Sequence, residues 1–255
     1  MPIQQKCKIT EIVKLNDFAY SFVLEVGDMI PGTGQFLQIQ CGHSRLLRRP
    51  ISICDWQEGK QENLLRIVFE VRGEGTEWLS RRKTGDVLDV LGPLGHGFET
   101  DSKGSYLLVG GGIGVPPLLG CAHNAWGNCT AVLGFRDAAH AMLLDDFQQA
   151  CRDVVITTDD GSLGRHGFVD AAVGELLEKG NDFTAILACG PKPMLKSIAR
   201  VAAQYGVPCK VSMEERMGCG VGACLVCACD MADGSRKHVC KDGPVFDSRE
   251  VDWNA

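Results

Sequence analysis

The pattern of apolar and polar positions divides the chain into parts of different character. Through residues 1–100, short apolar runs alternate with polar residues, and Gly, Pro and Asp residues separate one run from the next. A period of two is typical of half-buried β-strands, and the separators are typical of turns. This pattern predicts an all-β domain, either a small barrel or a sandwich. The expected strands are Phe18–Val26, Gln35–Cys41, Leu64–Arg72 and Asp86–Pro93.

After residue 100 the pattern changes, because runs that suit buried strands alternate with segments of helical periodicity. The segment Lys192–Gly206 is the clearest helix, since it ends on a glycine with Pro208 close behind. Strands alternating with helices predict a parallel α/β sheet over residues 101–210. The other expected elements are the strands Ser105–Gly112, Cys129–Asp137, Val154–Gly161 and Asp182–Pro191, and the helix Val169–Gly180.

Regular patterning fades beyond residue 210, where a segment rich in cysteine and glycine begins. The chain shows no internal repeat and no low-complexity tract. We therefore expect three parts, over residues 1–100, 101–210 and 211–255.

Composition and charge exclude several classes of protein. The chain has 255 residues, 45% of them apolar, which is enough for a packed core. Its net charge of −6 argues against a nucleic-acid-binding protein, which needs a basic face. The uncharged stretch Tyr106–Ala122 contains five glycines and two prolines. We interpret this stretch as strand, turn and helix, and expect no membrane span.

The cysteines indicate the compartment. There are thirteen of them, an odd number, and residues 1–18 lack the apolar core of a signal peptide. These features predict a reducing, cytoplasmic location. In that compartment a group of neighbouring cysteines is more consistent with metal ligands than with disulfides.

The segment Met217–Asp230 has four cysteines in fourteen residues. Cys219, Cys224 and Cys227 have the spacing C-x4-C-x2-C, and Cys240 follows. This is the plant-type spacing for a [2Fe–2S] cluster, which needs four thiolates and backbone N–H donors aimed at the sulfur atoms. Glycines permit the close backbone approach and the positive φ angles that such a loop requires. They are Gly218, Gly220 and Gly222.

A zinc site is the main alternative for this loop, and His238 could contribute to it. Zinc sites usually carry paired C-x2-C knuckles, however, and only one is present here. The spare thiol, Cys229, is expected to serve in packing or to lie behind the ligands. The spacing thus favours iron–sulfur over zinc.

Two further motifs lie in the β-rich part. In RRPISI (Arg48–Ile53), which we expect at the end of a strand, an arginine followed three residues later by a serine could contact a phosphate and a flavin ring. In VFEVRGEGTEWL (Val68–Leu79), the backbone N–H groups around the glycines could bind a pyrophosphate. Ordinary surface strand and an ordinary turn are the alternatives.

Two motifs in the α/β part suit a nucleotide site. GGGIGVPP (Gly110–Pro117) follows a strand and precedes a helix, although it is not a full G-x-G-x-x-G motif. ACGPKPML (Ala188–Leu195) places Cys189 and Gly190 at the carboxyl end of a parallel strand, where open α/β sheets bind ligands. A tight turn and a packing cysteine are the structural alternatives.

Taken together and in this order, the four motifs resemble the ferredoxin–NADP reductase superfamily, which joins a flavin-binding β-barrel to a nicotinamide-binding α/β domain. The resemblance covers about residues 10–209. The segments Glu214–Cys229 and His238–Val251 resemble the cluster-binding tail of the electron-transfer subunits of dihydroorotate dehydrogenase B. The resemblance implies an antiparallel FAD-binding barrel, a parallel α/β NAD-binding domain and a C-terminal [2Fe–2S] segment.

The resemblance also implies roles by position. Cys219, Cys224, Cys227 and Cys240 are the expected cluster ligands. The expected nicotinamide site is lined by Gly112, Gly114, Cys189 and Gly190. The superfamily pattern Arg-x-Tyr-Ser has Ile51 in place of tyrosine here, so one aromatic stacking surface is missing. The expected FAD contacts are Arg49, Pro50, Ile51, Ser52, Val68, Phe69, Glu70, Gly75 and Thr76.

The implied function is that of an electron conduit. A partner subunit carrying FMN would oxidise dihydroorotate, and electrons would reach NAD⁺ through the [2Fe–2S] cluster and FAD. The expected assembly is a heterotetramer with two copies of each subunit, serving pyrimidine synthesis. The chain itself needs no general acid or base, so we nominate no catalytic residue.

Two rival functions stay open at this point. One is the small subunit of a ferredoxin-dependent NADPH oxidoreductase or sulfide dehydrogenase, in which an aspartate commonly replaces the ligand that is Cys219 here. The other is a non-enzymatic iron–sulfur or zinc docking module, against which the intact RRPIS and CGPKPML strings argue. The sequence does not decide between NAD and NADP. Arg136 could meet a 2′-phosphate, or it could be an ordinary solvated arginine.

Overall fold

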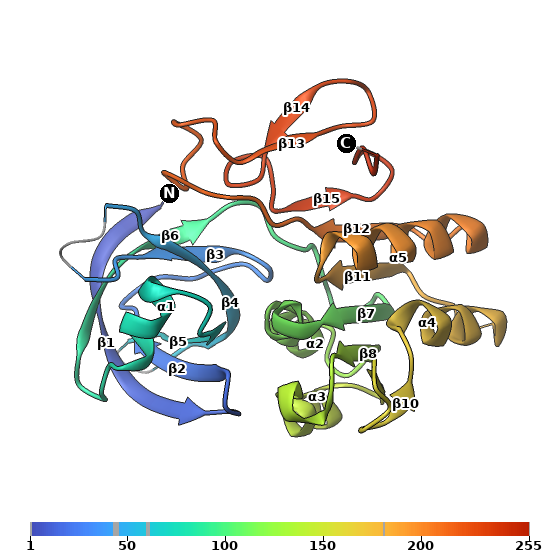
Figure 1. Ribbon diagram of the computed structural model, residues 1–255, viewed down its shortest axis with the longest axis horizontal. Coiled ribbons are helices and arrows are strands. Elements are labelled where there is room, and N and C mark those ends of the chain that lie inside the picture. Colours follow the sequence, from blue (N-terminus) through green and yellow to red (C-terminus); the bar gives the residue numbers. More distant parts are fainter. Residues whose placement is uncertain (1, 43–45, 60–61, 181, 255) are drawn as a thin grey trace.

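The structure is a computed structural model that describes residues 2–42, 46–59, 62–180 and 182–254. Within these residues, the N-terminal part is a closed antiparallel barrel with the strand order β1-β2-β5-β4-β3-β6 (Figure 1). The barrel prediction is confirmed, and the sandwich is excluded. The strands are β1 (Ile3–Lys14), β2 (Ala19–Glu25), β3 (Phe36–Ile39), β4 (Arg49–Gln57), β5 (Leu64–Glu70) and β6 (Val87–Leu94).

Three features of the barrel differ from what the sequence predicts. The alternation does not reveal β1, because Cys7 and Ile9 are its only fully buried side chains in a mostly polar strand. The RRPISI motif begins β4 and does not end a strand. The glycine-rich stretch after β5 is not a bare turn but leads into helix α1 (Glu74–Ser80), whose Leu79 packs into the barrel core.

The central part is a sheet of seven strands in the described chain, ordered β10-β9-β8-β7-β11-β12-β15. All neighbours are parallel except β12 and β15. The order reverses between β7 and β11, and ligands of open α/β sheets bind outside the carboxyl ends of the strands at such a switch point. The strands are β7 (Tyr106–Gly111), β8 (Cys129–Phe135), β9 (Asp153–Thr158), β10 (Arg165–His166), β11 (Ala185–Cys189), β12 (Cys209–Ser212) and β15 (Val245–Asp247).

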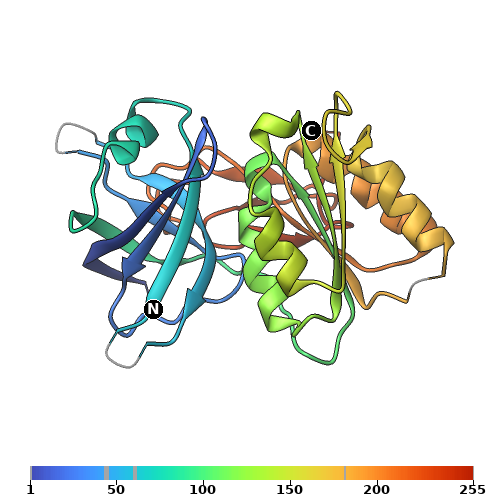
Figure 2. The ribbon, with the colours of Figure 1, turned by 90° about the horizontal axis from the view of Figure 1, so that it is seen from below.

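Helices cover both faces of this sheet. Successive side chains of a strand point to opposite faces, and on these strands the apolar side chains of both faces need to be buried. Along β7, Leu107 and Val109 belong to the core beneath α4 and α5, whereas Leu108 belongs to the core beneath α2 and α3 (Figure 2). Both predicted helices are present, as α4 and α5. The helices are η1 (Gly112–Gly114), η2 (Pro116–Leu118), α2 (Leu119–Asn124), η3 (Ala138–His140), α3 (Leu144–Ala150), α4 (Val169–Glu178) and α5 (Lys192–Tyr205).

The C-terminal segment lies across both other parts of the molecule, as the red trace in Figure 1 shows. It forms the small hairpin β13 (Ala228–Asp230) and β14 (Arg236–His238), and its strand β15 extends the central sheet. Phe246 shares one buried core with the α4–α5 side of the sheet and with Phe36 of the barrel. The backbone N–H of His96, just after the barrel, donates to the carbonyl of Gly243 at 2.5 Å. The segment is therefore built into the fold and is not an appended tail.

Ionic contacts join the barrel to the central domain on the α2–α3 side. His123 at the end of α2 lies 2.9 Å from the Asp55 carboxylate of β4. Beside this pair, Arg66 of β5 forms an ion pair at 2.5 Å with Asp146 of α3 and donates to the Ser21 hydroxyl at 2.9 Å. These pairs line a polar pocket between the two domains, so the charge of His123 bears on how the domains hold together.

We expect the free energy of unfolding to contain a contribution from His123 that fades as the pH rises. Its hydrogen bond to Asp55 raises the pKa of His123 against the effect of burial. A group whose pKa is raised by folding stabilises the fold fully below its unfolded pKa, about 6.5, and loses that effect as the pH passes the folded value. Because the side chain is 48% exposed, the effect should stay below about 1 kcal/mol, or roughly 2–4 °C in Tm.

Thermal unfolding of the parent and of His123→Gln at about pH 6 and about pH 8.5 measures this contribution. Near pH 6 the parent should unfold at a higher temperature than His123→Gln, and this difference in Tm should be smaller near pH 8.5. A difference that is equal at both pH values would contradict the titration of His123 and leave only a packing role.

Candidate functional site

The cysteine-rich loop directs backbone N–H groups at sulfur atoms. The Cys219 thiol accepts from the backbone N–H groups of Val221 at 3.4 Å, Ala223 at 3.2 Å and Cys224 at 3.4 Å. Burial opposes ionisation of this thiol, but the backbone donors outweigh burial and lower the pKa of Cys219 to about 6. A loop that stabilises a thiolate in this way suits a metal ligand, because thiolates are the binding form of cysteine.

The four predicted ligands form two pairs. The thiols of Cys219 and Cys224 lie within hydrogen-bonding reach of one another, and so do those of Cys227 and Cys240. A backbone donor, the N–H of Gly222, connects the two halves of the loop by pointing at the Cys240 sulfur at 3.1 Å. Two pairs of thiols match a two-iron cluster, in which each iron takes two of the four thiolates.

A mononuclear site fits less well. In the part of the chain that the structure describes, no group of three or more His, Cys, Asp or Glu side chains is arranged to hold one metal ion. His238, the alternative zinc ligand, faces Asp242 at 3.7 Å. Cys229 is buried in the core, and its thiol points to the carbonyl of Asp230 at 3.8 Å, which agrees with a packing role. The donor set therefore fits a [2Fe–2S] cluster better than zinc.

The glycines of the loop act in two ways. Gly220 and Gly222 have φ angles of +79°, as predicted for a loop that folds tightly around sulfur. Gly218 does not have a positive φ; its role is close approach, because a Cβ there would lie 3.0 Å from the Cys224 sulfur.

The predicted flavin motifs meet at the rim of the barrel. Arg49 begins β4 and crosses directly over Gly75 in the first turn of α1, where a Cβ would lie 2.5 Å from the Arg49 Nε atom. Arg49 donates to the carbonyl of Leu47 at 2.7 Å. A guanidinium thus lies beside the positive end of a helix, an arrangement that suits a phosphate. Pro50 is exposed and Ser52 half-buried on the same strand.

The structure limits how some of the other predicted flavin residues could take part. Ile51 and Phe69 point into the barrel core, and Val68 packs at the interface with the central domain. A flavin contact from Ile51 or Phe69 must therefore come from the backbone. The Thr76 hydroxyl accepts the Arg72 N–H at 2.9 Å, so it helps to fix the start of α1. Glu70 forms an ion pair with Arg72 at 2.7 Å.

The four predicted nicotinamide residues come together at the switch point of the sheet. Gly114 passes so close to β11 that a Cβ on it would lie 2.3 Å from the Cys189 carbonyl oxygen. A Cβ on Gly190 would in turn lie 3.2 Å from the Gly111 nitrogen. Burial raises the pKa of the Cys189 thiol to about 12, so this residue is a neutral thiol and not a nucleophile. Gly112 adopts a φ of +54° at the turn.

Comparison with known proteins matches the C-terminal segment and the central part of the chain to two domain families. Residues 214–252 match the model of the iron–sulfur cluster binding domain of dihydroorotate dehydrogenase B, and residues 108–200 match the oxidoreductase NAD-binding domain. The chain is 38% identical to the dihydroorotate dehydrogenase B (NAD(+)) electron transfer subunit of Caldanaerobacter subterraneus subsp. tengcongensis, over 97% of this chain and 98% of that one. It is 43% identical to the subunit of the same name from Geobacillus thermodenitrificans, over 86% of each chain.

The chain belongs to this family of electron transfer subunits. It is therefore the electron-transfer component of an oxidoreductase and works with a catalytic subunit. Among solved structures, the NADH-dependent reduced ferredoxin-NADP oxidoreductase, studied for flavin-based electron bifurcation, is 32% identical with a TM-score of 0.86, over 97% of this chain and 90% of that one. A ferredoxin reductase of carbazole 1,9a-dioxygenase, at 22% identity and a TM-score of 0.70, shares the fold over 81% of this chain and 67% of that one.

The uncharged stretch of residues 106–122 has the structure predicted for it. Residues 106–122 form β7, η1, η2 and the start of α2, as the strand, turn and helix prediction requires. In the described ranges no helix is both long and apolar enough to span a membrane.

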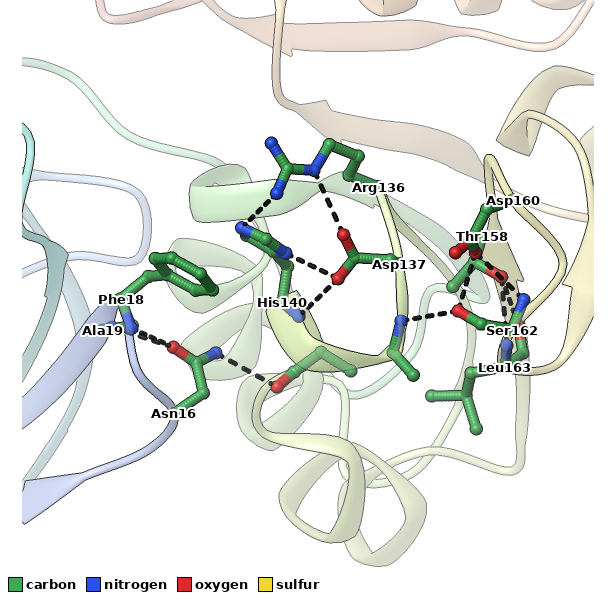
Figure 3. Close-up of polar contacts among 12 residues, drawn as sticks. Asn16, Phe18, Ala19, Arg136, Asp137, His140, Thr158, Asp160, Ser162 and Leu163 are labelled. Carbon is green, nitrogen blue, oxygen red and sulfur yellow. Dashed lines mark hydrogen bonds and ion pairs between the residues drawn. The ribbon is translucent and has the colours of Figure 1, made fainter.

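The structure shows one cluster at the carboxyl end of β8, of which the sequence had pointed only to Arg136 (Figure 3). The Asp137 carboxylate lies 2.6 Å from the Nδ1 atom of His140 and 3.1 Å from the Nε atom of Arg136. The Nη2 atom of Arg136 lies 3.0 Å from the other ring nitrogen of His140. An acidic residue shortly after the second strand of a nucleotide-binding sheet is the signal that would have singled out Asp137.

Proposed function

We propose that this electron transfer subunit carries electrons from the oxidation of dihydroorotate in an FMN-bearing catalytic subunit to NAD⁺, as part of pyrimidine synthesis in the cytoplasm. The observation that supports the proposal most is the pairing of the four thiols in a loop that lies over both the barrel and the sheet. FAD exchanges one or two electrons, so it supplies the link between single-electron transfer at a [2Fe–2S] cluster and hydride transfer to a nicotinamide.

The residues of this chain bind and orient. Cys219, Cys224, Cys227 and Cys240 hold the cluster, and backbone N–H groups of the loop stabilise the thiolates. Arg49 and the start of α1 hold the FAD pyrophosphate. The nicotinamide enters at the β7–β11 switch point, where Gly112, Gly114 and Gly190 leave room and the neutral Cys189 adds no charge. No side chain is assigned the role of general acid or base.

The partner is expected to cover the cluster loop. Cys224 is exposed, and three apolar side chains around it are largely exposed as well: Val221 at 47%, Val226 at 58% and Leu225 at 59%. Apolar side chains gathered around a redox centre favour a permanent interface, which typically buries about 2,000 Å² or more. We propose a heterotetramer of two copies of each subunit, because closed two-fold assemblies predominate among oligomers.

The test is reconstitution. The isolated chain, loaded with FAD and cluster, should oxidise NADH with an artificial electron acceptor and should not oxidise dihydroorotate. Addition of the FMN-bearing subunit should produce orotate with NAD⁺ as acceptor. Turnover of dihydroorotate by the isolated chain, or failure of any FMN-bearing subunit to bind it, would contradict the proposal.

The second candidate is the small subunit of a ferredoxin-linked NADPH oxidoreductase. The TM-score of 0.86 with the NADH-dependent reduced ferredoxin-NADP oxidoreductase is the observation in its favour. The cysteine at position 219 and the relatives at 38–43% identity favour the dihydroorotate assignment. Reduction of ferredoxin by the assembled complex in the absence of dihydroorotate would support this second candidate.

A further inference from the structure

The carboxyl end of β8 lies next to the predicted nicotinamide site. β8 pairs with β7 in parallel, with Gly134 opposite Gly111, and β7 pairs with β11 on its other side. Asp137 therefore follows the strand adjacent to the glycine turn of the switch point. A dinucleotide whose nicotinamide lies at that turn extends along the carboxyl edge of the sheet, and its adenosine ribose reaches the end of the second strand.

We infer that Asp137, held between Arg136 and His140, makes this subunit select NAD over NADP by accepting the free ribose hydroxyl and excluding a 2′-phosphate. The inference rests on the proposed function and deepens it, because it names the residue that decides which nicotinamide cofactor is used.

The hydrogen bonds around Asp137 leave room for a ribose hydroxyl. Its Oδ1 atom accepts from the backbone N–H of His140 at 3.1 Å and from the His140 ring at 2.6 Å. From the residues that the structure describes, its Oδ2 atom accepts only the Nε–H of Arg136. A carboxylate oxygen has two lone pairs, so Oδ2 keeps one for an incoming hydroxyl.

The charge of this cluster disfavours a 2′-phosphate. The His140 ring hydrogen bond is the main cause that lowers the pKa of Asp137 to about 2, with burial opposing and Arg136 assisting. The carboxylate is therefore ionised at neutral pH. The two ring nitrogens of His140 contact Asp137 and Arg136, so the ring joins the carboxylate to the guanidinium. A 2′-phosphate would meet a negative group, and the Arg136 guanidinium beside it is already paired with that group.

If its guanidinium were not paired with Asp137 and His140, Arg136 could bind a 2′-phosphate. Its side chain is 70% exposed, but its Nε and Nη2 atoms are engaged by Asp137 and His140. The sequence alone left this arginine as a possible 2′-phosphate contact. In the folded chain, Asp137 both repels a phosphate and holds Arg136 away from that task.

Neighbouring elements hold the cluster in place (Figure 3). The ring of Phe18, from the β1–β2 turn of the barrel, stacks on His140 with centroids 4.0 Å apart and an interplanar angle of 9°. On the other side, the Ser162 hydroxyl accepts the N–H of Ala138 at 2.8 Å and donates to Asp160 at 2.6 Å. The Asp137 carboxylate is thus positioned from both domains and does not move freely on a loop.

The test is the isosteric substitution Asp137→Asn in the full chain loaded with its cofactors. The ratio of kcat/KM for NADPH to that for NADH, measured with an artificial acceptor, should rise by roughly tenfold or more, mainly through KM. The double variant Asp137→Asn with Arg136→Ala should lose the part of this gain that the released arginine provides and keep the part that comes from removing the negative charge. Asp153→Asn, which lies at the amino end of β9 on the opposite edge of the sheet, is the matched control and should leave the ratio unchanged.

A binding measurement makes the outcome independent of turnover. Calorimetry with ADP-ribose and with its 2′-phosphate should show the same tenfold shift in relative affinity for Asp137→Asn. A ratio within about twofold of the parent in both assays would overturn the inference. A parent chain that binds ADP-ribose but does not oxidise NADH would instead count against the proposed function and leave the binding assay to decide on Asp137.

Discussion

Replacement of Cys227 by serine should remove the [2Fe–2S] cluster from this protein. Cys227 is 1% exposed and its thiol lies against Cys240, so its loss leaves one iron with a single thiolate in a buried place. Removal of a partner outside the ligand shell already costs about 10–100-fold in metal affinity, and removal of a ligand should cost more. Iron analysis and the visible spectrum measure the loss, and electron transfer to the catalytic subunit should fall with them.

The same loss is expected for Cys219→Ser, Cys224→Ser and Cys240→Ser. Cys229→Ser is the matched control, because this residue is also buried and lies only two residues from Cys227, but its thiol points to the Asp230 carbonyl. It should keep the iron content and the spectrum of the parent. Equal loss at Cys229 would show that the ligand set is wrong. Zinc without iron in protein prepared without air would contradict the iron–sulfur site itself.

Arg49→Ala should weaken the binding of FAD by roughly ten- to a hundredfold, because a charge-assisted hydrogen bond to phosphate contributes about 1.5–3 kcal/mol. The structure adds a second route to the same effect. Gly75→Ala would place a methyl group 2.5 Å from the Arg49 Nε atom and force the guanidinium out of position. Both variants should lose flavin on dilution, and titration of the flavin-free protein with FAD measures the affinity.

Arg81→Ala is the control for charge. Arg81 follows α1 in the chain, its side chain is 69% exposed, and it pairs with Glu77 away from Arg49. This variant should keep the FAD affinity of the parent. Retention of stoichiometric FAD by Arg49→Ala would mean that RRPIS is an ordinary strand and that the flavin is held elsewhere.

Much of the fold follows from alternation and from glycine placement. The strands that were predicted are those with continuous apolar faces, such as β2, β5 and β7, and the helices α4 and α5 follow from their periodicity. β1 escapes prediction because most of its outward residues are polar and its inner face has few apolar residues. α1 escapes because glycines at its start mask a short helix.

The candidate site was predictable as a set of motifs but not as a set of side-chain directions. Spacing alone predicts the four cysteines as cluster ligands, since three lie in one loop and Cys240 follows the hairpin that comes after it. It does not show that Ile51 and Phe69 point into the barrel, because that depends on the register of β4 and β5 in a closed sheet. The Asp137–His140 cluster depends on Phe18, which lies far away in the sequence and is brought near only by the packing of the barrel on the central domain.

The pairing of β15 with β12 has a consequence for how this chain can be divided. Without β15, the strand β12 (Cys209–Ser212) would be the exposed edge strand of the sheet. Its unpaired backbone N–H and C=O groups could then pair with strands of other chains. Natural proteins protect exposed sheet edges with short edge strands and charged side chains. β15 fits this rule, because it is short and carries Asp247, which pairs with Lys210 at 3.4 Å. The segment that holds the cysteine loop thus also protects the sheet edge from aggregation. A chain truncated before this segment would therefore lose solubility together with its iron.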